Sequence, residues 1–248
     1  MNIYFKQTDF GQFCLLENDL ISNCINEYGF WESHLYYFYS KFIKPTYTIV
    51  DGGANLGFHT VAFASLAYEG SVYSFEPQPL IFNMLSTNVL LNGASDIVKQ
   101  FRLGLSSSQG WLKMTPLSEQ IFSPDCINYG GRGLTESEEG EESVKLTTID
   151  SLEELHRLDL LKLDIQGSEL EAVQGGERTI REYKPIILLE NYIDQPKDQE
   201  LLQLLRGWGY EVYRLLIGNK EDCICVVPNK HIEEITFIEK QQQIQWTK

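Results

Sequence analysis

A short apolar segment followed by a glycine-rich turn constrains the fold more than any other feature of the chain. Residues 49–60 read IVDGGANLGFHT, which predicts the end of a strand, a tight turn and the start of a helix. A second predicted strand, residues 72–75, ends in Glu76. Glycines let the backbone approach a ligand closely, and an acid at the tip of the next strand can accept hydrogen bonds from a ribose diol. The two segments predict a nucleoside-type cofactor at the carboxyl ends of two parallel strands.

The acid in the turn decides which class of cofactor is favoured. A dinucleotide fingerprint reads G-x-G-x-x-G, and Gly52, Ala54 and Gly57 match it only imperfectly. The alternative pattern, acid-x-G-x-x-x-G, is matched by Asp51, Gly53 and Gly57. A carboxylate here would repel a pyrophosphate but suits a ligand that carries positive charge, such as the ammonium and sulfonium groups of S-adenosylmethionine. The turn therefore favours S-adenosylmethionine over NAD, with a turn that binds no cofactor as the third alternative.

Strands and helices alternate regularly from residue 47 onward. We predict strands at 47–51, 72–76, 97–103, 160–164 and 185–190, and helices near 57–68, 78–91, 168–182 and 196–207. Such alternation predicts an α/β fold with a doubly wound, mostly parallel, Rossmann-like sheet. Two last strands, 211–216 and 223–227, are joined by a short turn and should form an antiparallel hairpin.

The chain is expected to form one domain over residues 1–248. We divide it into a hairpin and a helix at 1–44, a Rossmann-like core at 45–228 and a tail at 229–248. An insertion at 106–146 interrupts the alternation, and its acidic stretch TESEEGEES predicts a solvated loop. Loops of this length in compact domains are often lids or binding loops.

Charge and composition exclude several classes of function. A net charge of −15 argues against nucleic-acid binding and against adhesion to anionic membranes. Five cysteines at no zinc-ligand spacing are expected to be reduced thiols, and four scattered histidines predict no metal site. The N-terminus lacks the apolar core of a signal peptide and no run of apolar residues is long enough to span a membrane, so a cytoplasmic location is expected. No oligomeric state is predicted.

A second group of polar residues follows two later strands. LDLLKLDIQGSEL, residues 158–170, predicts a strand that ends at Asp164 before a helix begins, and PIILLEN ends in Glu190 and Asn191. Because ligands bind beyond the carboxyl ends of parallel strands, these side chains and the glycine turn should border one cleft. As alternatives, Asp164 would cap the following helix and Glu190 would pair with a surface base.

Taken together, these motifs resemble the FkbM family of S-adenosylmethionine-dependent methyltransferases. The resemblance spans roughly residues 28–192 and is carried by YGFWE, VDGGANLGFHT, SFEP, TTIDSL, LLKLDIQGSELEAVQGG and PIILLEN. It implies a class I methyltransferase fold and O-methylation, often of sugar or polyketide-type hydroxyls. We therefore expect an O-methyltransferase for a small-molecule or glycan hydroxyl, with a sugar as the first choice. The alternatives are an NAD-dependent oxidoreductase and a non-catalytic nucleoside-binding module.

The resemblance and the strand pattern together give a set of candidate site residues. Cofactor contacts are expected from Glu32, Asp51, Gly52, Gly53, Asn55, Gly57, Phe58, Glu76, Pro77, Gly104, Leu105 and Asp164. Within these, Glu76 should hold the ribose, and the backbone at Gly104 and Leu105 should contact the adenine, because Ser106 and Ser107 follow where the family often has an acid. Substrate contacts are expected from Asn128, Arg132, Gln166 and Asn191.

Methyl transfer to an alcohol calls for a base that accepts the hydroxyl proton. The candidates are Asp164, then Glu190, then His59. Lys162 shares a strand face with Asp164 and would lower the pKa of that acid or bind the substrate oxygen, unless its stem is simply buried in the core. Gln166 stands where the family usually has glutamate, so it can orient other groups but cannot act as a base.

Overall fold

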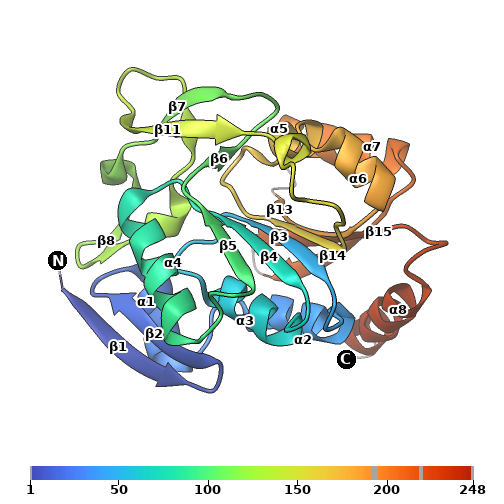
Figure 1. Cartoon of the computed structure of the whole chain (residues 1–248), viewed down its shortest axis with the longest axis horizontal. Helices are drawn as coiled ribbons and strands as arrows, with labels where there is room; N and C mark the ends of the chain where they lie inside the picture. The colour runs from blue at the N-terminus through green and yellow to red at the C-terminus, as the bar shows by residue number, and fades with distance from the viewer. Residues whose placement is uncertain (1, 192–194, 218–219, 247–248) are drawn as a thin grey trace.

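A seven-stranded sheet forms the centre of the computed structural model, which describes residues 2–191, 195–217 and 220–246 (Figure 1). The strand order is β14 (Glu211–Ile217), β15 (Lys220–Val226), β13 (Ile186–Asn191), β12 (Leu160–Leu163), β3 (Thr48–Gly52), β4 (Ser71–Phe75) and β5 (Val98–Phe101). The five strands from β13 to β5 are parallel, and β15 pairs antiparallel with both β13 and β14. The predicted α/β fold with a C-terminal hairpin is confirmed.

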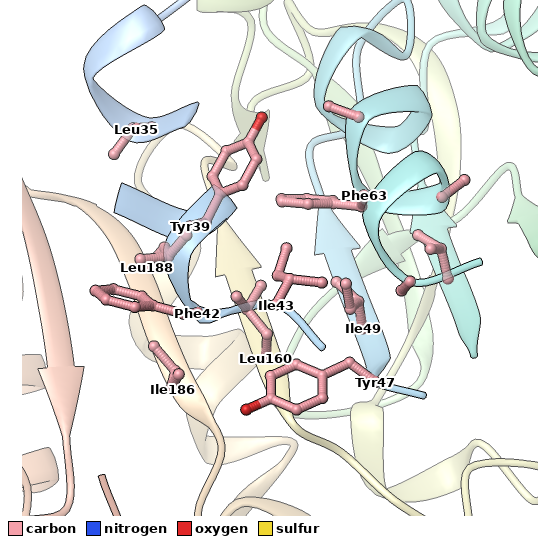
Figure 2. Close-up of a cluster of buried hydrophobic side chains, with 14 of the residues drawn as sticks. Leu35, Tyr39, Phe42, Ile43, Tyr47, Ile49, Phe63, Leu160, Ile186 and Leu188 are labelled. Atoms are coloured by element: carbon pink, nitrogen blue, oxygen red, sulfur yellow. The ribbon is translucent and has the colours of Figure 1, made fainter. Parts of the chain in front are cut away.

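Helices cover both faces of the sheet (Figure 1). Successive residues of each buried strand point to opposite sides, so both faces carry apolar side chains that need to be covered. On one face lie α2 (Ser33–Phe42), α3 (Phe58–Leu66), α4 (Pro79–Leu91) and α8 (Ile232–Trp246). On the other lie α5 (Glu169–Gln174), α6 (Glu177–Tyr183) and α7 (Pro196–Gly207). Figure 2 shows the first face, where Tyr39, Phe42 and Phe63 pack over Ile49 and Leu160.

The N-terminal segment is a hairpin followed by two helices, of which α2 is the helix expected within residues 1–44 and the first was not predicted from the sequence pattern. The hairpin strands are β1 (Ile3–Thr8) and β2 (Gly11–Leu16), as expected. Helix α1 (Leu20–Tyr28) follows, with the Asp19 side chain accepting a hydrogen bond from Ser22 N. The side chain of Asn88 in α4 fastens the hairpin to the core, since it bonds the Cys14 backbone and donates to Leu56 O at 2.7 Å.

The insertion is folded into short strands that the sequence pattern did not predict. It contributes a small sheet in the order β10 (Leu134–Thr135), β7 (Gly110–Met114), β11 (Glu141–Thr147) and β6 (Gly104–Leu105), and a hairpin of β8 (Ile121–Ser123) and β9 (Cys126–Ile127). Met114, Val144 and Leu146 form a small core under this sheet. The acidic stretch at residues 135–143 keeps its acidic side chains exposed, as expected, although residues 141–143 belong to β11 and the turn itself is confined to 136–140.

Two further boundaries differ from the predictions. The single helix expected at 168–182 is broken into α5 and α6 at Gly175 and Gly176, because the backbone at Gly175 lies against the carbonyl of Ser106. The expected tail at 229–248 contains α8, which buries Ile238 in the core of the first face. Within the described ranges, no helix has both the length and the apolarity to cross a membrane.

Candidate active site

A deep cavity opens at the carboxyl ends of β3, β4 and β12, where an α/β sheet usually binds its ligand. Counted together with the open solvent at its mouth it spans about 990 Å³, so a nucleoside-sized ligand can enter. Most of the predicted site residues line it: Glu32, Gly53, Asn55, Phe58, His59, Glu76, Pro77, Gly104, Leu105, Asn128, Arg132, Lys162, Asp164 and Gln166. Asp51, Gly52, Gly57 and Glu190 are not part of its wall. The side chain of Asn191, at the end of β13, lies outside the described part of the chain.

The glycine turn forms the floor of the cavity. Gly53 has a φ of 73°, and a Cβ at this position would collide with the carbonyl oxygen of Asp164. The turn is tied to β4, because Gly53 N and Ala54 N donate to Phe75 O at 3.0 and 2.9 Å. Asn55, with a φ of 50°, also adopts the left-handed conformation. The backbone strain therefore gathers at the cavity, as is common at ligand sites.

Glu76 presents a buried carboxylate to the cavity. Its Oε1 accepts from Gln78 N at 2.9 Å and its Oε2 from Asn55 N at 3.0 Å, so its direction is fixed by the backbone. Burial raises the pKa of Glu76 to about 7, although the two backbone hydrogen bonds act in the opposite direction. The group is thus an oriented acceptor whose charge changes near neutral pH.

Asp51 lies behind the cavity wall. It is fully buried, and its Oδ2 accepts from Thr60 Oγ1 at 2.5 Å while its Oδ1 lies 3.5 Å from Lys162 Nζ. Lys162 also lies 3.9 Å from Asp164 Oδ2 and donates to Gly53 O at 3.3 Å. Burial alone would lower the pKa of Lys162, but the carboxylates of Asp51, Asp164 and Glu32 raise it above its ordinary value. Lys162 is therefore a permanent cation in the wall, and Asp51 acts on the cavity through it.

Glu32 and His59 belong to one hydrogen-bonded chain. His59 Nε2 lies 3.0 Å from Glu32 Oε2, and His59 Nδ1 lies 2.9 Å from the hydroxyl of the buried Tyr39. Burial opposes ionisation of Glu32, yet the bond to His59 and the charges of His59 and Lys162 hold its pKa below the ordinary value. Both ring nitrogens of His59 are engaged by protein groups. Glu32, with a φ of 47°, offers the cavity a fixed negative charge.

Asp164 and Glu190 are joined by one amide. Gln166 Nε2 donates to Asp164 Oδ1 at 2.8 Å and to Glu190 Oε2 at 2.7 Å. Glu190 faces a small crevice that adjoins the cavity and shares Glu32, Lys162 and Asp164 with it. In the same crevice, Asp222 Oδ2 lies 2.6 Å from His34 Nε2. Of the two acids, Asp164 is the one that borders the main cavity.

The insertion and the N-terminal segment together roof the cavity. Arg132 is buried and its guanidinium donates to Thr115 O at 2.9 Å and pairs with Glu141 and Glu142 at 3.1 and 3.2 Å. The roof is fastened to the core through Gln78, whose Nε2 donates to Tyr129 O at 2.9 Å. Arg132 thus lines the cavity while its main bonds hold the insertion together.

Several wall residues were missed by the sequence analysis. Apart from Gln78 they are apolar or small, and carry no chemical signal that marks a site: Leu20, Ile21, Trp31, Ala54, Leu56, Phe75, Leu103, Met114, Gly130, Leu134 and Ile165. Gln78 was identifiable only by its position two residues beyond Glu76. Within the described residues, no three His, Cys, Asp or Glu side chains gather closely enough to hold a metal ion.

Comparison with known proteins identifies the relatives of this architecture. The family model described as the methyltransferase FkbM domain matches residues 51–212, which is more than half of the chain. Methyltransferase sdnD of Sordaria araneosa is 28% identical over 192 residues, covering 67% of this chain and 74% of its own. The hexuronic acid methyltransferase AglP of Haloferax volcanii is 30% identical over 151 residues, covering 60% and 57%. The 2-O-methyltransferase NoeI of Sinorhizobium fredii is 26% identical over 164 residues, covering 61% and 65%.

Solved structures agree on the fold. The crystal structure of methyltransferase FkbM from Methylobacillus flagellatus superposes with a TM-score of 0.53 at 18% identity, covering 74% of this chain and 44% of that one. The precorrin-6y C5,15-methyltransferase of Geobacter metallireducens gives a TM-score of 0.50 at 13% identity, covering 79% and 87%. The chain therefore has the class I methyltransferase fold, and it spans less than half of the FkbM protein whose crystal structure it matches.

Proposed function

The chain belongs to the FkbM methyltransferase family, and we propose that it transfers the methyl group of S-adenosylmethionine to a hydroxyl of a small-molecule or glycan acceptor, with a sugar hydroxyl as the first choice. The observation that carries the proposal is one cavity that holds an oriented acceptor, Glu76, after β4 and a carboxylate, Asp164, after β12, the two strands that flank β3. A sugar is favoured because two relatives are a hexuronic acid methyltransferase and a 2-O-methyltransferase.

The residues of the cavity fit the cofactor. Glu76 offers two carboxylate oxygens with fixed direction to a ribose diol. The apolar wall of Phe75, Leu105 and Met114 suits a flat heterocycle, and Glu32 suits an ammonium group. The absence of a side chain at Gly53 leaves the floor open to a close approach. When bound, S-adenosylmethionine supplies an electrophilic methyl group on a sulfonium.

Asp164 is the group that we assign as acceptor of the hydroxyl proton. His59 is unsuited because both of its ring nitrogens are already hydrogen-bonded within the protein. Lys162 is unsuited because it stays protonated. Glu190 is held behind Gln166 at the adjoining crevice, whereas Asp164 borders the cavity with its Oδ2 facing Lys162 at 3.9 Å. The proton of the acceptor hydroxyl would therefore pass to Asp164 as the carbon–oxygen bond forms.

The proposal is tested by incubating the protein with S-adenosylmethionine and a panel of glycosides and uronic acids. We expect S-adenosylhomocysteine and a product 14 Da heavier than the acceptor, the mass of an added CH2 group, for at least one sugar. S-adenosylhomocysteine should also raise the melting temperature, whereas NAD should leave it unchanged. Stabilisation by NAD alone would remove the cofactor assignment. Methylation of amines but of no hydroxyl in a matched panel would remove the acceptor assignment.

A further inference from the structure

Both N–H groups of the Gln166 side-chain amide donate to carboxylates. A primary amide has two N–H hydrogens, and Gln166 Nε2 makes one bond to Asp164 and one to Glu190, at 2.8 and 2.7 Å. The two acids come from the ends of the adjacent strands β12 and β13. Two carboxylates that bond the same nitrogen lie close enough to repel one another, and a neutral double donor between them offsets part of that repulsion.

The backbone that carries Gln166 is held in a strained conformation. Gln166 and Gly167 both have positive φ, 54° and 92°. The buried carboxylate of Glu169 accepts from Ile165 N at 2.8 Å and from Gly167 N at 2.9 Å, and Lys197 Nζ donates to Gly167 O at 2.7 Å. From the other side, Gly133 of the insertion packs so closely that a Cβ there would lie 2.6 Å from Gln166 O. A strained turn held from both sides keeps the amide in one place.

We propose that Gln166 is the positioning residue of the site: its amide fixes the rotamer of Asp164 and couples that carboxylate to Glu190. The inference rests on the proposed function, in which Asp164 accepts the proton of the acceptor hydroxyl. A glutamate at this position would add a third negative charge and remove both donors, whereas glutamine supplies the donors at no charge.

Charged and titratable groups from every neighbouring element surround this unit. They are Lys162 of β12, Asp51 of β3, Asp222 of β15, Glu32 and His34 at the start of α2, His59 of α3, Glu169 of α5, Lys197 of α7 and Arg132 of the insertion. A variant at Gln166 changes none of these groups. A change in its pH dependence therefore reports on the pair of hydrogen bonds from Gln166 to Asp164 and Glu190, called the bridge below.

The first test compares Gln166→Glu with Gln203→Glu, which adds the same charge to an exposed position of α7. A new carboxylate beside Asp164 disfavours the ionised form of that acid, so the acid limb of the kcat–pH profile should move to higher pH by about one unit. At pH values below this limb kcat should fall by about tenfold, with KM for S-adenosylmethionine within about twofold of wild type. Gln203→Glu should change neither. A purely structural role would lower stability and leave the limb where it is, and that result overturns the proposal.

The second test uses the ligand-free wild-type protein and does not depend on folding of a variant or on finding an acceptor. The side-chain amide protons of Gln166, assigned by selective labelling, should exchange slowly and should shift as the two carboxylates titrate. Amide signals that exchange as fast as those of an exposed glutamine, or that ignore the acid titration, would show that the bridge does not form in solution. If no acceptor is ever methylated, the proposed function fails, but this measurement still shows whether Gln166 bonds both carboxylates in solution.

Discussion

Glu76 should make cofactor affinity depend on pH near neutrality. In the ligand-free protein burial raises its pKa to about 7, whereas two ribose hydroxyls that donate to it would favour the ionised form. Affinity should therefore be complete above pH 7 and fall as the pH drops through that value, by about tenfold per unit. Calorimetric titration with S-adenosylhomocysteine between pH 5.5 and 8 measures the effect. A dissociation constant that is flat over this range would contradict the ribose assignment, and Glu76→Gln should bind weakly at every pH.

Asp164 should matter for turnover and not for cofactor binding. Asp164→Asn keeps the shape of the side chain and removes its ability to accept a proton, so kcat should fall roughly a hundredfold or more. The dissociation constant for S-adenosylhomocysteine should stay within about threefold of wild type, since a shape-preserving change leaves the cofactor contacts in place. Asp96→Asn, at an exposed loop position, is the matched control and should behave as wild type. Normal turnover in Asp164→Asn would show that Asp164 is not the base and would make Glu190 the next candidate.

The sequence predicted that polar residues at strand ends would lie close together, and the structure brings several of them to one cavity. Glu76, Asp164 and Gln166 were identified by their places at strand ends, and all three border the cavity. Their partners could not be read in the same way. That Asp51 turns toward Thr60 and Lys162, behind the wall, depends on side-chain packing across three elements. Apolar wall residues such as Trp31 look like any other core residue in a sequence.

The turn between β3 and α3 tolerates no side chain at its second glycine. Gly53→Ala would require a positive φ of an alanine and would drive its Cβ into the Asp164 carbonyl. We expect a loss of about 2 kcal/mol in the free energy of unfolding and roughly 6 °C in melting temperature, together with weaker cofactor binding. Thermal denaturation with and without S-adenosylhomocysteine measures both.

Gly207→Ala is the matched control for this prediction. Gly207 ends α7, has no positive φ, and an added Cβ would meet nothing within 4 Å. The substitution should be neutral or slightly stabilising, because alanine has the higher helix propensity. Equal melting temperatures for the two variants would mean that the turn relaxes freely and that close packing at Gly53 is not required.

Long periodic elements were predicted from the sequence, and short or non-local ones were not. The parallel strands and α4 and α7 appear close to the expected ranges, because each carries a continuous pattern of buried residues. The strands of the insertion are short, and β7 pairs with β11, which lies far along the chain. A local sequence pattern therefore does not predict them. The break between α5 and α6 arises from the contact of Gly175 with the Ser106 backbone, a distant partner that a helical pattern does not reveal.

At the scale of the whole molecule, the cavity exists because two distant segments meet over it. Residues around Leu20 to Glu32 and residues around Asn128 to Leu134 supply the roof, and Ile127 N donates to Asn18 O at 2.8 Å where they touch. Within the insertion, Arg132 holds its part of the roof together through its contacts with Thr115, Glu141 and Glu142. The ligand site is thus a property of the assembled chain and of no single element.

Arg132→Lys should loosen the roof while the core stays folded. Lysine keeps the charge, but its single ammonium cannot replace the planar guanidinium group that contacts Thr115 O, Glu141 and Glu142 together. We expect faster hydrogen exchange over residues 112–135 and about tenfold weaker binding of S-adenosylhomocysteine, with unchanged exchange in β3 and β12. Lys113→Ala removes an exposed ion pair with Glu138 in the same insertion and should have little effect. Identical exchange in both variants would show that Arg132 does not hold the roof.

The two ends of the insertion lie side by side, since β6 and β11 pair in parallel with Gly104 opposite Leu146 and Leu105 opposite Thr147. A segment whose entry and exit are neighbours can lengthen, shorten or be exchanged without moving the strands that carry Glu76 and Asp164. The fold thus makes the roof of the cavity exchangeable independently of its floor. Grafting the corresponding segment from a relative would change the residues above the cavity and leave the sheet beneath it unchanged.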